Sequence, residues 1–394
     1  MRTYQELFRT PEFMPLFLTC AGQVAAQTVS GLALGTLVYA ATGSPLLSAL
    51  SMFGSSFAQV IGAVALLSAA DRLPPRAAMS GMALAFGLGT AVLAVPGLPL
   101  WAVFAVVLSL GLVASVGGGV RYGLLTELLS EEGYLLGRSV LNMTSGTMQI
   151  CGFAIGGVLV TTLSPRGTLL AAAGLHLLAA VTARLGLSRR SPRTVGRPSV
   201  AVTWRTNALL WSATPRRYVF LALWVPNGLI VGCESLFIPY APGNPGLLFA
   251  VAACGMLIGD TATGRFVPQR WRARIGLPLQ LLLAAPYLAF ALRPGLPLAA
   301  AVVVLASVGY SASLLLQERL VALTPTDVRG QALGLHSAGM LTMQGIGAAL
   351  AGAVAQRSSA TTAMAVMATA SVAVTLVLAP GLRPTRAPVG SVRS

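Results

Sequence analysis

The chain is dominated by apolar stretches that are each long enough to cross a membrane. Two of them, Pro45–Ala69 and Ala77–Val95, flank a short segment, SAADRLPPRAAM, that carries one acid and two arginines. About 20 apolar residues folded as a helix span the hydrocarbon core of a bilayer. Because no water is present there to hydrogen-bond the backbone, we expect each stretch to be a helix.

The composition agrees with a chain embedded in a lipid bilayer. Only 9% of the 394 residues are charged and 55% are hydrophobic, whereas a soluble domain is about 25% charged. We therefore predict an all-α integral membrane protein. Twelve transmembrane helices are expected, at 13–40, 45–69, 76–96, 99–127, 138–163, 167–187, 217–241, 245–266, 275–293, 296–322, 328–355 and 359–380. Their short connections, such as ATGSP and RPGLP, contain Pro and Gly, which end one helix and begin the next.

The longest polar segment divides the twelve helices into two groups of six. We expect an N-terminal six-helix bundle over 1–187, an arginine-rich linker over 188–216, a C-terminal six-helix bundle over 217–382 and a tail over 383–394. In each half the fourth helix is followed by an acid, a turn, an arginine and a glycine-rich helix. Paired repeats are typical of secondary transporters, whose substrate site lies between the halves near the membrane midplane.

All 26 basic residues are arginines, and they are concentrated in the connections on one side of the predicted membrane. The opposite connections contain only Arg166, Arg293 and Arg357. By the positive-inside rule both termini are cytoplasmic, which an even number of spans requires. The net charge of +16 is explained by this topology, and we expect no nucleic-acid partner because no compact basic domain exists.

The sequence predicts neither a cofactor nor a metal. The four cysteines lie within apolar runs, and no pair of them has metal-ligand spacing. The phosphate-binding loop G-x-x-x-x-G-K-[ST] requires a lysine, which the chain lacks. We therefore expect an ion gradient, or the gradient of the substrate itself, to supply the energy.

The loop after the second predicted helix resembles a known motif. In the pattern G-x-x-x-D-R-x-G-R-R the chain has Asp71, Arg72 and Arg76, while Leu67, Pro74 and Pro75 replace the other defined residues. With the twelve spans, the central linker and the half-repeat, the chain resembles transporters of the major facilitator superfamily over essentially its whole length. The opening RTPEFMPLFLTCAGQVAAQ is similar to that of members related to bacterial drug and siderophore exporters.

The resemblance implies that this loop is a cytoplasmic gate between the halves. Its arginines are able to pair with acids such as Glu127, so the predicted gate comprises Asp71, Arg72, Arg76, Glu127 and Arg138. The alternative is a basic loop that only sets the topology.

Glycines in the fifth helix predict close helix packing. Gly152, Gly156 and Gly157 have the small-xxx-small spacing that lets helices approach closely. Exporters of the family often carry G-x-x-x-G-P-x-x-G-G here, and Met148 and Phe153 replace the first Gly and the Pro.

Three ionisable side chains within spans are candidates for proton coupling, because such groups are costly in a membrane and usually mark function. Glu234 lies beyond Pro226 in the seventh helix, where it is able to carry a proton or meet a cationic substrate; a wetted structural acid is the alternative. Asp260 either carries a proton or pairs with Arg265 as a latch. His176 is the third candidate, because the histidine side chain ordinarily titrates near neutral pH, but a lone histidine in an apolar helix is more often a packing residue.

Scattered polar side chains are candidates to line a substrate cavity. Gln23 and Gln27 are four residues apart, so they share one helix face. Such groups either orient a substrate or join helices together. Arg121 either holds an anionic substrate, pairs with a neighbouring acid or extends to the interface. The full set is Gln23, Gln27, Gln59, Arg121, Asn142, Gln149, Asn227, His336 and Gln344.

These features predict a monomeric transporter in the bacterial plasma membrane that moves a small amphipathic molecule by alternating access. Efflux in exchange for protons is the leading mechanism. The alternatives are an uncoupled facilitator or importer of the same fold, and a membrane enzyme acting on lipid. The enzyme would need a catalytic cluster, and His176 and His336 stand alone in their spans.

Overall fold

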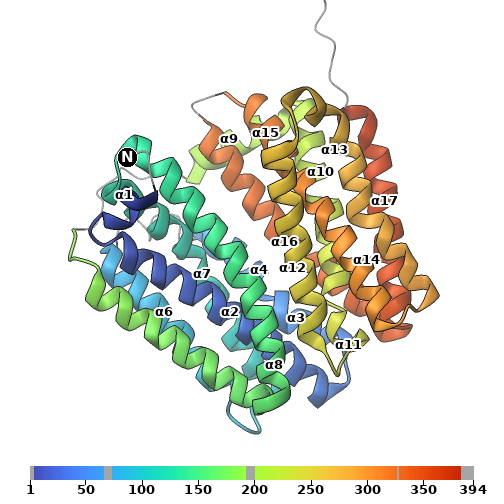
Figure 1. The fold of residues 1–394 in the computed structure, drawn as a ribbon, viewed down its shortest axis with the longest axis horizontal. Helices are drawn as coiled ribbons and strands as arrows, with labels where there is room; N and C mark the ends of the chain where they lie inside the picture. The colour runs from blue at the N-terminus through green and yellow to red at the C-terminus, as the bar shows by residue number, and fades with distance from the viewer. Residues whose placement is uncertain (1–3, 66–72, 192–199, 326–327, 383–394) are drawn as a thin grey trace, which may run out of the picture.

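The computed structural model describes residues 4–65, 73–191, 200–325 and 328–382. Within these ranges the chain consists of helices joined by irregular segments and contains no strands (Figure 1). Eleven helical stretches there are long and apolar enough to cross a membrane. One of them, Leu136–Gly186, is interrupted at Ser164, where φ is +70° and Pro165 follows. That stretch therefore supplies two spans, and the predicted all-α fold with twelve transmembrane helices is confirmed.

The first half of the chain begins with a short helix, α1 (Tyr4–Arg9), and the first span, α2 (Phe13–Thr42). Gly43 ends α2 in the left-handed conformation, φ +61°, and its N–H bonds to Tyr39. The Ser44 side chain then caps the next helix by accepting from the N–H of Leu47, with Pro45 in the first turn. The remaining helices of this half are α3 (Pro45–Phe53), α4 (Ser55–Ala65), α6 (Pro75–Leu93), α7 (Leu100–Leu128) and α8 (Glu131–Gly186).

In the second half, several spans are broken into consecutive helical pieces. Its elements are α9 (Val200–Ser212), α10 (Thr214–Glu234), α11 (Phe237–Tyr240), α12 (Pro245–Phe266), α13 (Gln269–Ala284), η1 (Ala285–Leu292), α14 (Leu296–Val308), η2 (Gly309–Ser311), α15 (Ala312–Ala322), α16 (Arg329–Arg357), α17 (Ala360–Leu378) and η4 (Ala379–Leu382).

Helix α9 lies within the segment that the sequence indicates only as a polar linker. Leu210 is fully buried, and the Trp211 ring stacks on Trp224 of α10 with centroids 5.7 Å apart. The end of this segment therefore packs on the second half. The sequence did not indicate this helix, because many polar residues surround its short apolar face.

The two halves are joined near one end of the molecule (Figure 1). There α8 contacts α12, and α3 contacts α16. The Phe153 ring stacks on Phe249 with centroids 4.7 Å apart, and Ser44 Oγ donates to Gln356 Oε1 over 2.8 Å. These residues lie close to the connections 43–44, 241–244 and 358–359, which we call the joined end. Helices α1 and α9 lie at the opposite end, which faces the cytoplasm in the predicted topology.

Candidate substrate cavity and buried carboxyl group

The first half encloses a cavity of about 420 Å³. Its wall is formed by residues of α2, α3, α4, α6 and α7. Many of the lining side chains carry hydrogen-bonding groups: Gln23, Gln27, Ser30, Ser51, Ser55, Gln59, Thr90 and Arg121. The cavity therefore lies among membrane-spanning helices and offers a ligand hydrogen-bonding partners that lipid does not.

Four residues that the sequence suggests for a substrate cavity come together on this wall. Gln23 and Gln27 lie on α2, Gln59 on α4 and Arg121 on α7. Among the residues that the structure describes, none forms a hydrogen bond or ion pair with these four side chains; the Arg121 guanidinium lies 5.9 Å from the centre of the neighbouring Tyr122 ring. Their polar groups are thus available to a ligand.

Other candidates for this cavity lie elsewhere. Asn142 and Gln149 are exposed on α8, and Asn142 Oδ1 accepts from the Tyr122 hydroxyl over 3.2 Å. Gln344 is half-buried on α16. His336 is buried on the same helix, and its backbone carbonyl accepts from Trp224 Nε1 over 3.0 Å. None of these side chains lines the cavity, and their suggested role in substrate binding stays a prediction.

Glu234 is the last residue of α10 and is only 7% exposed. The Tyr310 hydroxyl, on η2, donates to Glu234 Oε1 over 3.0 Å. Within the described ranges no cation pairs with this carboxyl group, and its neighbours Cys233 and Leu236 are fully buried. Glu234 is therefore a carboxyl group inside the membrane-spanning region that is held by a phenol and not by a counter-ion.

The proline in α10 before Glu234 leaves backbone carbonyl groups that side chains of neighbouring helices bind. Pro226 has no N–H, so the carbonyl of Ala222 loses its helical partner. Gln280 Nε2, on α13, donates to that carbonyl over 3.1 Å, and Ser371 Oγ, on α17, donates to the carbonyl of Pro226 over 3.2 Å. Asn227 is buried beside a void of about 10 Å³, and its Oδ1 has no partner among the described residues.

The other two candidates for proton coupling differ in exposure. His176 is fully buried on α8, 5.4 Å from the Phe86 ring, and neither of its nitrogens has a partner in the described part of the chain. Asp260 is exposed on α12 and forms no ion pair with Arg265. A role in proton coupling stays a prediction for both.

The predicted gate is only partly within the described residues. Asp71 and Arg72 lie outside them. Arg76 is half-buried at the start of α6, and the Arg138 guanidinium lies 5.2 Å from the centre of the Tyr122 ring. Glu127 pairs with Arg190, their atoms Oε2 and Nε being 3.5 Å apart. Arg190 lies at the start of the predicted linker, directly after the first half, so this ion pair does not join the two halves.

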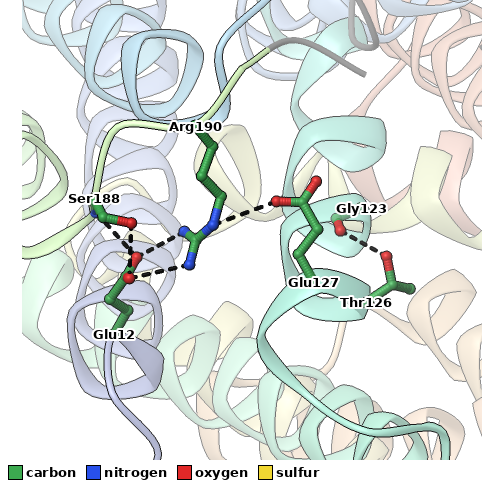
Figure 2. A network of polar contacts seen from close by, with 6 residues as sticks. All are labelled: Glu12, Gly123, Thr126, Glu127, Ser188 and Arg190. Atoms are coloured by element: carbon green, nitrogen blue, oxygen red, sulfur yellow. Dashed lines mark hydrogen bonds and ion pairs between the residues drawn. The ribbon is translucent and has the colours of Figure 1, made fainter. Parts of the chain in front are cut away.

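Arg190 also binds Glu12, which immediately precedes α2 (Figure 2). Its Nη1 and Nη2 donate to the two carboxylate oxygens over 2.7 and 3.0 Å, and the Ser188 hydroxyl and N–H donate over 2.8 and 3.0 Å. Burial alone would raise the pKa of Glu12, but the bonds from Arg190 and Ser188 outweigh it and lower that pKa below its usual value. We call Glu12, Glu127, Ser188 and Arg190 the end network, because they connect the start of α2 with the ends of α7 and α8.

Glycines of α8 lie at two different helix contacts. A Cβ on Gly152 would lie 2.8 Å from Thr28 of α2, and one on Gly156 would touch Val29 of the same helix. A Cβ on Gly157 would lie 2.8 Å from the Cα of Gly246, on α12 of the other half. The same short run of sequence therefore packs inside one half and against the other.

Sequence reasoning missed the end network, the Tyr310 partner of Glu234 and the bonds from Gln280 and Ser371. One signal was available: a proline inside a span leaves a carbonyl that some neighbouring donor must satisfy. The sequence could not say which helix supplies that donor. Tyr310 has no local signal at all, because it lies 76 residues from Glu234.

No protein-family model matches the sequence, and no curated protein matches it significantly. Solved structures do match. The nucleoside transporter NupG superposes with a TM-score of 0.77 at 12% identity, over 94% of this chain and 99% of that one. A POT family transporter in complex with 5-aminolevulinic acid superposes with a TM-score of 0.74 at 14% identity, over 94% of this chain and 96% of that one. A bacterial homologue of the human lysosomal transporter Spinster, inward-facing and unoccupied, superposes with a TM-score of 0.73 at 13% identity, over 94% of this chain and 95% of that one. With twelve spans and this likeness over nearly its whole length, the chain has the major facilitator fold.

Proposed function

We propose that the protein is a secondary transporter that moves a small organic molecule across the bacterial plasma membrane by alternating access, exporting it in exchange for protons. The observation that carries the proposal is the cavity of about 420 Å³ among membrane-spanning helices. Its volume suits a small organic ligand, and its glutamines and arginine are without protein partners among the described residues.

The arrangement of the halves supports the alternating step. The contacts between Ser44 and Gln356 and between Phe153 and Phe249 lie at the joined end. Because that end is extracytoplasmic in the predicted topology, we interpret this arrangement as an inward-open state. The likeness to an inward-facing solved transporter agrees. For the outward-open state these contacts must separate while the gate around Asp71, Arg72 and Arg76 closes.

Glu234 is our proposed proton carrier. It is buried in a span, bound by Tyr310 and without a counter-ion among the described residues. Ionisable groups of this kind mark proton and ion pathways. Because Glu234 ends α10 close to α11 and the joined end, separation of the halves there changes its surroundings. The carboxyl group then takes up a proton in one state and releases it in the other.

Flux into proteoliposomes tests this proposal. Vesicles with an acidic lumen receive a panel of labelled amphipathic compounds, and protein-free liposomes correct for passive uptake. Proton antiport predicts accumulation that a protonophore abolishes and that Glu234→Gln removes. Glu318→Gln is the matched control, because Glu318 is an exposed acid that pairs with Arg272.

The outcomes separate the alternatives. Accumulation that depends on the gradient in wild type and in Glu318→Gln, but not in Glu234→Gln, supports antiport through Glu234. Flux that ignores the gradient and is equal in all three proteins removes the proton from the mechanism and favours a facilitator. Gradient-driven flux in the opposite sense favours an importer.

A further inference from the structure

We infer that the cavity of the first half binds an organic anion, with Arg121 as its counter-ion. The inference deepens the proposed function by naming the charge class of its substrate. It starts from the charges around the cavity. Arg121 is the one charged side chain among the described residues of the wall, and no acid lines it.

Arg121 differs from other arginines whose partners are known. Arg190 binds Glu12 and Glu127, and Arg272 binds Glu318. Arg121 has no carboxylate within ion-pair distance among the described residues, and it lies at the depth of a span. A guanidinium group is costly in such surroundings unless an anion accompanies it. A bound ligand is the missing anion that the geometry indicates.

The rest of the wall specifies what the anion carries with it. The amides of Gln23 and Gln59 offer hydrogen bonds, while the Phe86 ring, Met52 and Leu34 provide apolar surface. A planar guanidinium recognises a carboxylate by two parallel hydrogen bonds. The ligand that fits is therefore a carboxylate on an apolar, preferably aromatic, body.

An anionic substrate agrees with the proposed direction. The inside-negative potential of a bacterial membrane drives an anion outward and a proton inward, so both movements in an export cycle release energy. Import of the same anion by an uncoupled route would run against the potential. The charge class and the direction therefore support each other, although each is tested separately.

Binding to the purified protein in detergent tests the inference without any transport. The probes are 2-naphthoate, its neutral counterpart 2-naphthylmethanol and the cation 2-naphthylmethylammonium, which share one aromatic body. Wild type is expected to bind the acid at least about tenfold more tightly than the alcohol and to bind the cation most weakly. Isothermal titration calorimetry gives the affinities.

Variants assign the preference to one residue. Arg121→Gln is expected to bind acid and alcohol equally, and Arg121→Lys is expected to keep part of the preference. Arg274→Gln is the matched control, because the Arg274 guanidinium also lies against an aromatic ring, 5.4 Å from the centre of the Trp271 ring, but does not line the cavity. If Arg121→Gln does not fold, the ratio of the affinities for the acid and the alcohol, measured in wild type and in Arg121→Lys, still tests whether Arg121 binds the anion.

Equal affinity for acid and alcohol in wild type overturns the inference, as does an unchanged preference in a folded Arg121→Gln. These failures leave the transporter itself intact. Conversely, selective binding of 2-naphthoate without gradient-driven flux supports the anion site and contradicts proton-coupled export.

Discussion

The polar side chains that line the cavity of the first half and those that surround α10 in the second half differ in whether they have protein partners. In the first half, three glutamines and Arg121 line a cavity of about 420 Å³ without protein partners among the described residues. In the second half, Gln280 and Ser371 donate to backbone carbonyls of α10, Tyr310 donates to Glu234, and the void lined by Gln280 and Tyr310 is about 10 Å³.

This difference indicates how one repeated architecture divides its tasks. Polar groups that are left unpaired in a cavity are available to a ligand, whereas polar groups that bond to each other fix the shape of a helix and the position of an acid. We therefore expect the first half to tolerate changes of side-chain volume at its cavity and the second half to tolerate few. The predictions below test that contrast.

The largest effect is expected where α10 and α16 approach most closely. A Cβ on Gly347 would overlap the carbonyl of Gly228, and backbone atoms cannot move aside as a flexible side chain does. Gly347→Ala should destabilise the protein by about 3 kcal/mol or more. Gly31→Ala is the matched change in the cavity wall of the first half, where a Cβ meets nothing within 4 Å.

Thermal unfolding in detergent and the yield of monodisperse protein measure both variants. Gly31→Ala should unfold at or slightly above the wild-type temperature, because alanine favours a helix over glycine by about 0.8–1.0 kcal/mol. If the two variants are equally stable, the close contact between α10 and α16 does not limit packing and the contrast between the halves is wrong.

A second, smaller effect on stability is expected when either of two glutamines is replaced by leucine. Gln280→Leu removes the donor to the Ala222 carbonyl and leaves that buried group unsatisfied, which should cost about 1–3 kcal/mol. Gln59→Leu removes an amide that has no protein partner among the described residues, so its cost should be near zero. Thermal unfolding of the two variants under identical conditions gives the difference.

The same two variants should rank in the reverse order when their effect on ligand affinity is measured. Gln59→Leu should weaken binding of 2-naphthoate, while Gln280→Leu should leave it unchanged in whatever fraction of the protein is folded. A Gln59→Leu protein that is as destabilised as Gln280→Leu would show that Gln59 joins helices, which is the other role that the sequence allows.

The sequence predicts the fold well because membrane helices are encoded locally. Each span needs a long apolar run, and Pro and Gly mark its ends, so Pro45 and Gly43 locate a helix boundary without knowledge of any neighbour. The break at Ser164 follows from Pro165 in the same way.

The candidate site is encoded less directly. Gln23 and Gln27 share a helix face, which one helix reveals, but the approach of Gln59 and Arg121 to that face depends on how three helices pack. The pairing of Glu234 with Tyr310 depends on how α10 packs against η2, which the sequence does not give. The partner of the predicted gate residue Glu127 could not be predicted for the same reason. That partner is Arg190, which follows the end of α8 and reaches Glu127 only in the folded chain.

The smallest effect is expected at the end network, which holds the first half together at its surface. Glu12 has φ +67°, an uncommon conformation for a residue other than glycine, and Arg190 and Ser188 hold its carboxylate there.

The contribution of the end network to stability depends on pH, because the pKa of Glu12 is lower in the folded protein than its usual value, near 4.3. The network stabilises the fold at pH values above that usual pKa, and this contribution is lost as the pH falls through the folded pKa. The stability of wild type relative to Glu12→Gln should therefore be about 1 kcal/mol or less at pH 6, should decrease as the pH falls below about 4.3, and should vanish below the folded pKa of Glu12. Thermal unfolding of both proteins across this range measures the difference, and a difference that persists unchanged to pH 3 would show that hydrogen bonds, and not the charge of Glu12, hold the start of α2 in place.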